Sequence, residues 1–347
     1  MRILFPALFI LAVLAVFLAA CVSSVPPASG DTLAPALTTV HVAYLPLISN
    51  GPLFIAIDEG FFRQQGIDVQ LEKFQSSTEA LPALVNGDIA VSGGQLTPGF
   101  INAIAQGGHV RIVADKGRIA PGYCNSTALL VRRDLVVNGT VRNISDLRGL
   151  KVAATTDQSY GVSRALALGN LTTKDVEMLN MANDQSIVGF ENGAVDSALL
   201  MEPYITEAVS HGKAVVFLPG ADFIPNSVNP LYFGPVFLDS NPDLGRRFMV
   251  AYLEGVRQYN QGKTPRNVQI LSNYTHLDRE LLEQSCWAQI SPDGTVPHDS
   301  VRDYVDWMYA SKKITQKPGD DQLFDMSYAE YANSVLQNST SAGIPGK

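Results

Sequence analysis

The chain has 347 residues, of which 46% are hydrophobic and 17% charged, and its formal net charge is −8. This composition is typical of a globular protein with an ample core, and the length favours two domains over one. The acidic balance, without any basic run, argues against binding to nucleic acid or to anionic lipid. None of the five histidines has metal-ligand spacing with another histidine, cysteine or acidic residue, so we expect no metal site and no cofactor.

The first 21 residues have the pattern of a secretory leader. Arg2 is the only charged residue, residues 3–18 are almost entirely apolar, and Leu18-Ala19-Ala20 leads to Cys21. This order resembles a bacterial-type lipobox, in which the leader is removed before the cysteine and the thiol carries a lipid. We therefore expect an extracytoplasmic protein anchored at Cys21 to the outer face of the cell membrane. The alternative is that residues 3–20 stay on as a transmembrane anchor.

Two further features bear on an exported protein. Cys124 and Cys286 are compatible with one disulfide in an oxidising compartment, and equally with two buried small side chains. Asn-x-Ser/Thr triplets occur more often than this composition predicts by chance, and they are candidate glycosylation sites if the host modifies exported proteins. These triplets begin at Asn125, Asn138, Asn143, Asn170, Asn273 and Asn338.

Strands alternate with helices from residue 39, after a small, polar, proline-bearing stretch at 22–38 that indicates a flexible tether. The first unit is expected to have strands at 40–45, 68–74, 89–92 and 110–114, and helices at 52–65, 77–86 and 97–106. The second is expected to have strands at 151–154, 176–179, 197–201 and 214–218, and helices at 159–168, 184–192 and 203–211. Beyond residue 239 only helices are expected, at 242–261, 265–273, 278–289, 301–311 and 327–337. Such alternation predicts parallel sheets flanked by helices.

A faint internal echo indicates two similar lobes. In two places a predicted helix ends at Asn-Gly, and an aspartate then precedes a strand of small residues. These places are Leu84-Val-Asn-Gly-Asp88 and Phe190-Glu-Asn-Gly-Ala-Val-Asp196. Ligands of open α/β sheets bind beyond the carboxyl ends of the strands. Two lobes whose strand ends face each other therefore predict a clamshell binder with a cleft between them.

Several motifs occur in a fixed order over about residues 40–217. They are Tyr44-Leu-Pro46, Ala56-Ile-Asp-Glu-Gly-Phe-Phe62, Gly66-Ile-Asp-Val69, Ala83-Leu-Val-Asn-Gly-Asp88, Leu147-Arg-Gly-Leu-Lys-Val152, Glu191-Asn-Gly-Ala-Val-Asp196 and Met201-Glu-Pro-Tyr204. This set resembles the substrate-binding proteins of ABC importers that take up nitrate, alkanesulfonates, taurine and thiamine-pathway pyrimidines.

The resemblance implies a fold of the α/β class, a two-lobed periplasmic-binding-protein-like clamshell. Each lobe would be a mixed, mostly parallel sheet flanked by helices, followed by a helical C-terminal tail. Lobe I would comprise residues 39–125 and 226–347, and lobe II residues 126–225. The implied partners are a small-molecule ligand and an ABC permease with a cytoplasmic ATPase, and we expect a monomer.

The candidate ligand-binding residues lie in loops and at predicted helix starts. Free backbone N–H groups and hydroxyls at helix starts can hold a polar or anionic group, although plain helix capping explains them equally well. A Gly-Gly pair permits close approach of a ligand, and aromatic side chains can form a wall or belong to the core. The predicted residues are Tyr44, Asn50, Phe54, Ser76, Ser77, Gly93, Gly94, Thr155, Thr156, Ser159, Glu202 and Tyr204.

The ligand itself is less well defined. Donor-rich helix starts favour a small organic anion of the sulfonate, taurine or nitrate kind, although Asp157 would repel an anion. The aromatic side chains together with Glu202, Asp157 and Gln158 would instead suit a nitrogen heterocycle such as a pyrimidine. The nearest basic residues are Lys116, Arg118 and Arg164.

Three other functional classes compete with import. No Gly-x-Ser-x-Gly, phosphate-binding loop or cysteine cluster occurs, so we do not expect an enzyme. A ligand-sensing ectodomain that acts through a separate membrane partner stays open as an alternative. A structural role at the cell surface would fit the asparagine triplets but would not explain two lobes.

Overall fold

The computed structural model describes residues 36–119 and 122–342. The predicted leader with Cys21, and all but the end of the predicted tether, lie outside the described residues. In the described ranges, no helix has both the length and the apolar character that a membrane span requires.

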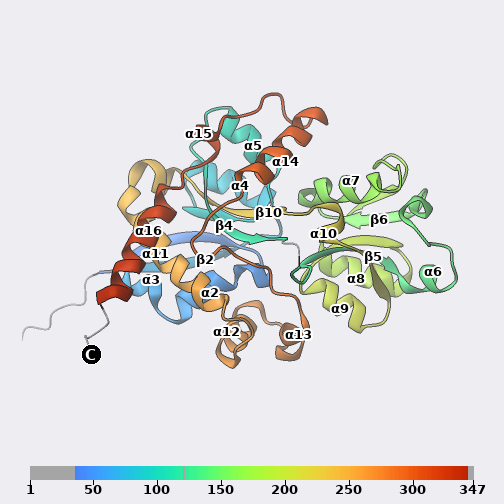
Figure 1. Ribbon diagram of the computed structural model, residues 1–347, viewed down its shortest axis with the longest axis horizontal. Coiled ribbons are helices and arrows are strands. Elements are labelled where there is room, and N and C mark those ends of the chain that lie inside the picture. Colours follow the sequence, from blue (N-terminus) through green and yellow to red (C-terminus); the bar gives the residue numbers. More distant parts are fainter. Residues whose placement is uncertain (1–35, 120–121, 343–347) are drawn as a thin grey trace, which may run out of the picture. The chain divides into compact units, whose positions relative to one another are not determined.

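Five strands form the first sheet, in the order β2-β1-β3-β10-β4 (Figure 1). β1 pairs in parallel with β2 and β3, whereas β10 runs antiparallel to β3 and β4. The strands are β1 (Thr38–Tyr44), β2 (Ile67–Lys73), β3 (Val91–Gly93), β4 (Arg111–Arg118) and β10 (Val228–Phe233). We call this sheet and the helices packed on it lobe I.

The second sheet repeats the plan in the order β7-β6-β8-β5-β9. β6 pairs in parallel with β7 and β8, and β5 runs antiparallel to β8 and β9. The strands are β5 (Thr127–Arg132), β6 (Lys151–Ala154), β7 (Glu177–Asn180), β8 (Ser197–Met201) and β9 (Ala214–Pro219). We call this sheet and its helices lobe II. The prediction of two α/β lobes with mixed, mostly parallel sheets is confirmed.

The antiparallel strand of each sheet follows a crossover between the lobes. The chain passes from β4 in lobe I to β5 in lobe II, and later returns from β9 in lobe II to β10 in lobe I. In each lobe, the strand that follows the crossover is the one that runs antiparallel to its neighbours. Neither strand was predicted from the sequence. Pro230 interrupts the pattern of β10, since proline cannot donate a ladder hydrogen bond, and residues 128–131 of β5 form a continuous apolar run without alternation.

Helices surround both sheets. In lobe I and the crossovers they are α2 (Gly51–Asp58), α3 (Phe61–Gln64), α4 (Ser77–Asn86), α5 (Pro98–Ala105) and α10 (Gly220–Phe223). Lobe II has α6 (Arg133–Val137), α7 (Ser159–Ala167), α8 (Asn183–Asn192) and α9 (Tyr204–Ser210). The C-terminal region has α11 (Pro242–Tyr259), α12 (Pro265–Thr275), α13 (Arg279–Gln284), α14 (His298–Ala310), α15 (Asp320–Leu323) and α16 (Ser327–Ala342). Short irregular helices lie at Ile48–Asn50, Ile144–Leu147, Thr156–Gln158 and Val236–Ser240.

Two predicted helices differ from the structure because of local backbone conformation. The helix expected at 52–65 is divided because Gly60 adopts a left-handed φ of 77° between α2 and α3. The helix expected at 278–289 ends at Gln284, since Ser285 is already extended with ψ of 151°. The following segment therefore runs as an irregular strap that carries Cys286.

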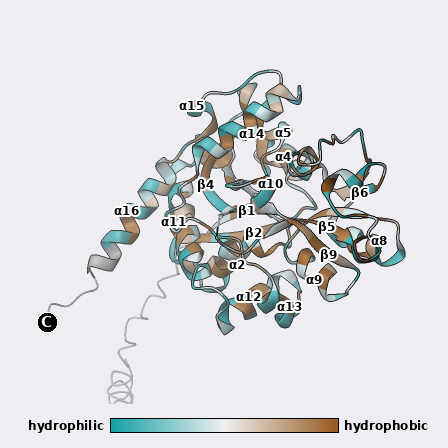
Figure 2. Ribbon diagram, turned by 45° about the vertical axis from the view of Figure 1, so that its right-hand side comes forward, coloured by the Kyte–Doolittle hydropathy of each residue, from teal (hydrophilic) through white to brown (hydrophobic). Residues whose placement is uncertain are grey.

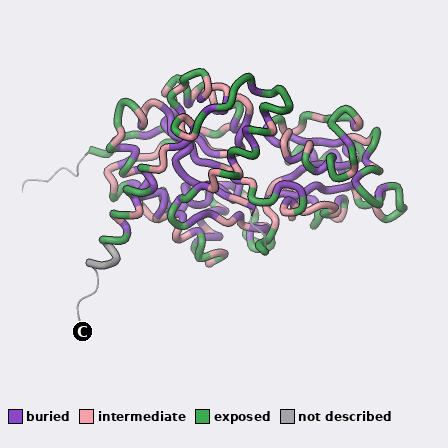
Figure 3. Tube along the Cα trace, turned by 45° about the horizontal axis from the view of Figure 1, so that its top comes forward, coloured by how far each residue is buried: buried purple, intermediate pink, exposed green. Residues whose placement is uncertain are grey.

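Buried apolar side chains cover both faces of each sheet. On one face of the first sheet, Phe248 and Tyr252 of α11 pack against strand residues such as Phe233. On the other face, the rings of Phe100 and Tyr232 stack with their centroids 4.1 Å apart. Hydrophobic ribbon follows the strands in Figure 2, and buried segments trace both sheets in Figure 3. Each fully buried side chain of this size stabilises the fold by about 1.5–3 kcal/mol.

Candidate functional site

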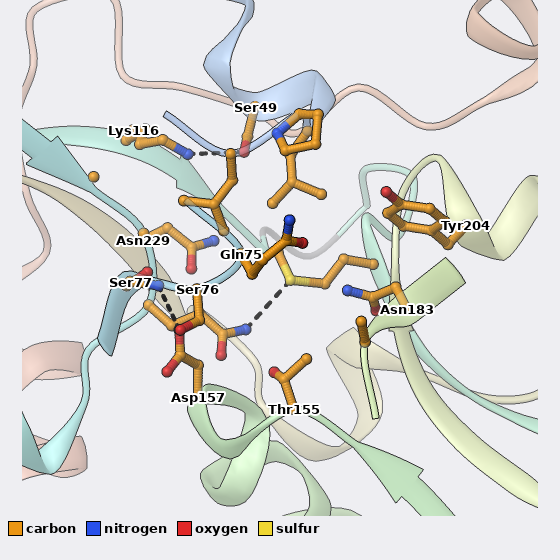
Figure 4. A pocket seen from close by; sticks show the side chains of 18 of the residues that line it. Ser49, Gln75, Ser76, Ser77, Lys116, Thr155, Asp157, Asn183, Tyr204 and Asn229 are labelled. Atoms are coloured by element: carbon orange, nitrogen blue, oxygen red, sulfur yellow. Dashed lines mark hydrogen bonds between the residues drawn. The ribbon is translucent and has the colours of Figure 1, made fainter. Parts of the chain in front are cut away.

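A cavity of about 160 Å³ lies between the two lobes (Figure 4). Its walls are formed mostly by loops at the carboxyl ends of β1, β2, β3, β6, β7 and β8, where ligands of open α/β sheets bind. The lining residues are Leu45, Pro46, Leu47, Ser49, Lys73, Gln75, Ser76, Ser77, Gly93, Gly94, Gln95, Lys116, Thr155, Asp157, Ala182, Asn183, Asp184, Met201, Tyr204 and Asn229.

Lys116 is a buried cation in the wall of this cavity. It belongs to β4, has an exposed fraction of only 3%, and its Nζ donates a hydrogen bond of 2.9 Å to Ser49 Oγ. Among the described residues it forms no ion pair. Burial lowers the pKa of Lys116 to about 8, against the smaller opposing effect of Asp115. An anionic partner in the cavity would restore the missing stabilisation of this ammonium group.

The two glycines of the Gly93-Gly94 pair make room for neighbouring side chains. A Cβ at residue 93 would lie 2.5 Å from Lys116 Cδ, and a Cβ at residue 94 would lie 1.9 Å from Ser77 Oγ. The glycines therefore let Lys116 and Ser77 reach the cavity wall. Close approach of a ligand, the reason expected from the sequence, stays a prediction.

The N-terminus of α4 is occupied by a carboxylate from lobe II. Asp157 Oδ2 accepts a hydrogen bond of 2.8 Å from the backbone N–H of Ser77, and Asp157 Oδ1 accepts one of 2.5 Å from Thr78 Oγ1. Ser76 caps the same helix, because its Oγ accepts from the N–H of Glu79 at 3.1 Å. Figure 4 shows Asp157 directed toward Ser77 across the cleft.

The lobes also touch at other points around the cavity. Gln95 of lobe I donates from Nε2 to Met201 Sδ at 3.5 Å. Tyr160 of α7 packs against Tyr304 and Trp307 of α14, with centroids 4.2 and 5.0 Å apart. Together with the Asp157 bonds, these contacts join the two lobes.

Half of the twelve predicted ligand-binding residues line this cavity. They are Ser76, Ser77, Gly93, Gly94, Thr155 and Tyr204. Burial raises the pKa of Tyr204 to about 12, so the phenol is a neutral hydrogen-bonding group at physiological pH.

Three of the other predicted residues belong to the packing of lobe I. Phe54 is fully buried, stacks on Tyr274 at 4.9 Å and meets the edge of Tyr44 at 5.7 Å. Asn50 is buried and uses its amide to donate to the carbonyl of Leu45 at 2.6 Å. These side chains support the loop after β1 rather than the cavity itself.

The remaining three lie in lobe II outside the cavity. Thr156 Oγ1 donates to Asn180 at 3.3 Å, and Ser159 begins α7. Glu202 is buried and accepts from the N–H and Oγ1 of Thr206 and from the N–H of Cys286. Burial raises the pKa of the Glu202 carboxyl, partly offset by these hydrogen bonds. Glu202 therefore joins lobe II to the strap after α13.

The structure joins Cys124 and Cys286 by a disulfide, with the Cα atoms 5.7 Å apart. Cys124 lies in the crossover between β4 and β5, and Cys286 in the strap after α13. Of the two alternatives left open by the sequence, the bridge is the one formed. Among the described residues, no group of three or more His, Cys, Asp or Glu side chains is arranged to hold a metal ion.

Several lining residues were missed by the sequence analysis. Met201 belongs to a quoted motif but was not chosen as a site residue, and the others carry no motif of their own: Ser49, Lys73, Gln75, Gln95, Asn183, Asp184 and Asn229. Apart from Ser49 and Asn229, they lie at or just beyond the carboxyl end of a predicted strand, so the general rule for α/β sheets would have pointed to them.

Comparisons with known proteins find similarity over most of the chain. The model of the NMT1-like family matches residues 33–268. The "Putative aliphatic sulfonates-binding protein" of Bacillus subtilis (strain 168) is 23% identical over 313 residues, which cover 85% of this chain and 88% of the relative.

Solved structures share the fold. The periplasmic nitrate-binding protein NrtA from Synechocystis PCC 6803 superposes with a TM-score of 0.72 at 16% identity, over 90% of this chain and 92% of that chain. The desulfurization enzyme DSZB superposes with a TM-score of 0.65 at 13% identity, over 86% and 99%. The same fold thus serves binding proteins and an enzyme.

Proposed function

The chain belongs to the NMT1-like family, because that family's model matches more than half of it, and on this premise we propose that it is the solute-binding component of an ABC importer. It captures a small organic anion of the sulfonate, taurine or nitrate kind between its lobes and delivers it to a membrane permease driven by a cytoplasmic ATPase. The names of its relatives support this ligand class. The protein acts outside the cytoplasm as a monomer, held to the membrane by a lipid on Cys21.

The observation that carries the proposal is the buried ammonium group of Lys116. A buried lysine is costly unless an opposite charge joins it, and Lys116 is one of the residues that line the cavity. Ser49, bonded to the same Nζ, adds a hydroxyl to the same wall. An oxyanion seated here would gain charge-assisted hydrogen bonds that exist only when the solute is bound.

The direct test is a thermal-shift screen of the purified protein. The solutes are taurine, alkanesulfonates, nitrate, bicarbonate and thiamine-pathway pyrimidines. A ligand that binds only the folded state raises the Tm in proportion to the logarithm of its concentration. We expect one of the anions to give this shift. A shift with pyrimidines alone would overturn the anion assignment, and no shift in a folded sample would favour a sensor for another ligand.

The pH dependence of binding gives a second prediction. An anion requires the ammonium form of Lys116, whose pKa of about 8 lies within reach of titration. The Kd of a sulfonate, which itself does not titrate here, should be constant below pH 7 and rise about tenfold per pH unit well above pH 8. Calorimetry between pH 6.5 and pH 10 measures this, with circular dichroism as the check on folding. A Kd that stays flat to pH 10 would contradict a role for Lys116.

The bond between Lys116 and Ser49 also favours a second candidate function. A serine beside a lysine of lowered pKa is an arrangement used by serine nucleophiles, in which the neutral amine is the base. A hydrolase of this kind would be labelled at Ser49 by phenylmethylsulfonyl fluoride. We expect no added mass in intact-protein mass spectrometry, because a lysine that holds an anion stays protonated. Labelling that Ser49→Ala abolishes would favour the enzyme.

A further inference from the structure

The sequence predicts an oxyanion at the N-terminus of α4, and two of the backbone donors there are already bonded to side chains of the protein. The backbone N–H of Ser77 points at Asp157, and that of Glu79 points at the hydroxyl of Ser76. Helix N-termini attract anions because unpaired N–H groups and the helix dipole act together. Here the anion comes from the protein itself, and it comes from the opposite lobe.

The geometry of Asp157 makes it a good substitute for a free oxyanion. Its two carboxylate oxygens each accept one bond from lobe I, at 2.8 Å and 2.5 Å. Asp157 has an exposed fraction of 7% and Ser77 one of 2%, so the bond to the Ser77 N–H is shielded from water, whereas Thr78 is exposed. The turn at Thr156–Gln158 presents the side chain, and Thr155 fixes that turn because its N–H donates to Gln158 Oε1 at 2.8 Å.

We propose that Asp157 is a specificity-determining residue that fills the anion position of α4 whenever the lobes meet. This inference rests on the proposed anion-binding function and deepens it. An external oxyanion is excluded from α4 by the bonds that Asp157 forms there. The anionic group of the solute is therefore received elsewhere in the lobe I wall of the cavity, at the buried pair of Lys116 and Ser49.

The test is an acetate titration of Asp157→Ala, because acetate replaces the carboxylate that the substitution removes. In a buffer free of other carboxylates and of oxyanions, saturable acetate binding at α4 is followed by the amide resonance of Ser77, because thermal shift would also report acetate at Lys116. We expect Asp157→Ala to bind acetate at least tenfold more tightly than the wild-type protein does. In the double variant Asp157→Ala/Thr78→Val, which lacks one of the two donors, acetate binding should weaken again.

Asp184→Ala is the matched control. Asp184 also lines the cavity, but it accepts from its own neighbour Gln185 and not from lobe I, so its removal should create no acetate site. If Asp157→Ala does not fold, Asp157→Asn keeps the size of the side chain, and we expect it to bind acetate more weakly than the alanine variant would but more tightly than wild type.

Two results would overturn the inference. One is equal acetate binding by wild type and the Asp157 variants. The other is acetate binding to Asp157→Ala that Thr78→Val leaves unchanged, which would place the acetate elsewhere. Since no transported solute is present in these titrations, their outcome is independent of the sulfonate screen, and either proposal can fail alone.

Discussion

Replacing Lys116 by methionine is expected to weaken sulfonate binding at least about thirtyfold. Methionine matches the lysine side chain as far as Cε, the part that packs over Gly93, but removes the ammonium group. Truncating one partner of a buried, hydrogen-bonded charge pair costs roughly 2–5 kcal/mol of binding free energy, and 2 kcal/mol corresponds to about thirtyfold in Kd. Calorimetry with the sulfonate that gives the largest thermal shift measures the change.

Lys73→Met is the matched control for this substitution. Lys73 also lines the cavity, and replacing it by methionine removes the same charge, but the Lys73 side chain is exposed. Solvent screens an exposed charge, so the variant should alter Kd by only a few fold. The unliganded Lys116→Met protein should also be at least as stable as wild type, since it no longer buries a charge. Equal loss of affinity in both variants would show that general electrostatic attraction, rather than Lys116, holds the anion.

The helices and strands predicted most accurately are those whose ends have clear start and stop signals in the sequence. The helix at 77–86 has both bounds as expected, because Ser76 caps its start and Gly87 ends it with φ of 82°. The strands at 151–154 and 197–201 are also as expected, since each is a short apolar run between turn residues. A short apolar run also occurs in β5, which was nevertheless missed, so this signal is not sufficient by itself. Both β5 and β10 are defined by pairing with partners far along the chain.

The candidate site was predictable only in part for a related reason. Local patterns identified the donors at the start of α4 and the loop after β3. They could not identify the partner of those donors, because Asp157 is 80 positions from Ser77 in the sequence. The sequence analysis expected Asp157 to repel an anion. In the structure it takes the anion's place at α4, and this follows from tertiary contact alone.

Lys116 was considered only as a basic residue near the loops. Its importance depends on which face of β4 it occupies and on the absence of a side chain at Gly93. In a strand that is buried on both faces, polar and apolar residues do not alternate, so the sequence does not show toward which face a given side chain points. Asp115 and Lys116 are neighbours with opposite charges, yet the carboxylate bonds to Gly117 and Ser291 while the ammonium group faces Ser49. Packing, rather than composition, separates these charges.

Removing the disulfide is expected to lower the free energy of unfolding by about 2–5 kcal/mol. The bridge joins residues 162 positions apart, so its loss releases a long loop in the unfolded chain. It also frees the strap whose Cys286 N–H donates to Glu202 of lobe II. Urea denaturation of Cys124→Ser/Cys286→Ser against the oxidised wild type measures the difference from the shift in the transition midpoint.

Reduction of the wild-type protein is the internal check on this value. Because it opens the same loop without changing the sequence, it should lower the midpoint by the same amount as the double substitution. Ligand affinity should change much less than stability, since neither cysteine lines the cavity. A double variant as stable as the oxidised protein would mean that the crossover before β5 and the strap after α13 are held together by their surroundings, with Glu202 as the main link between strap and lobe II.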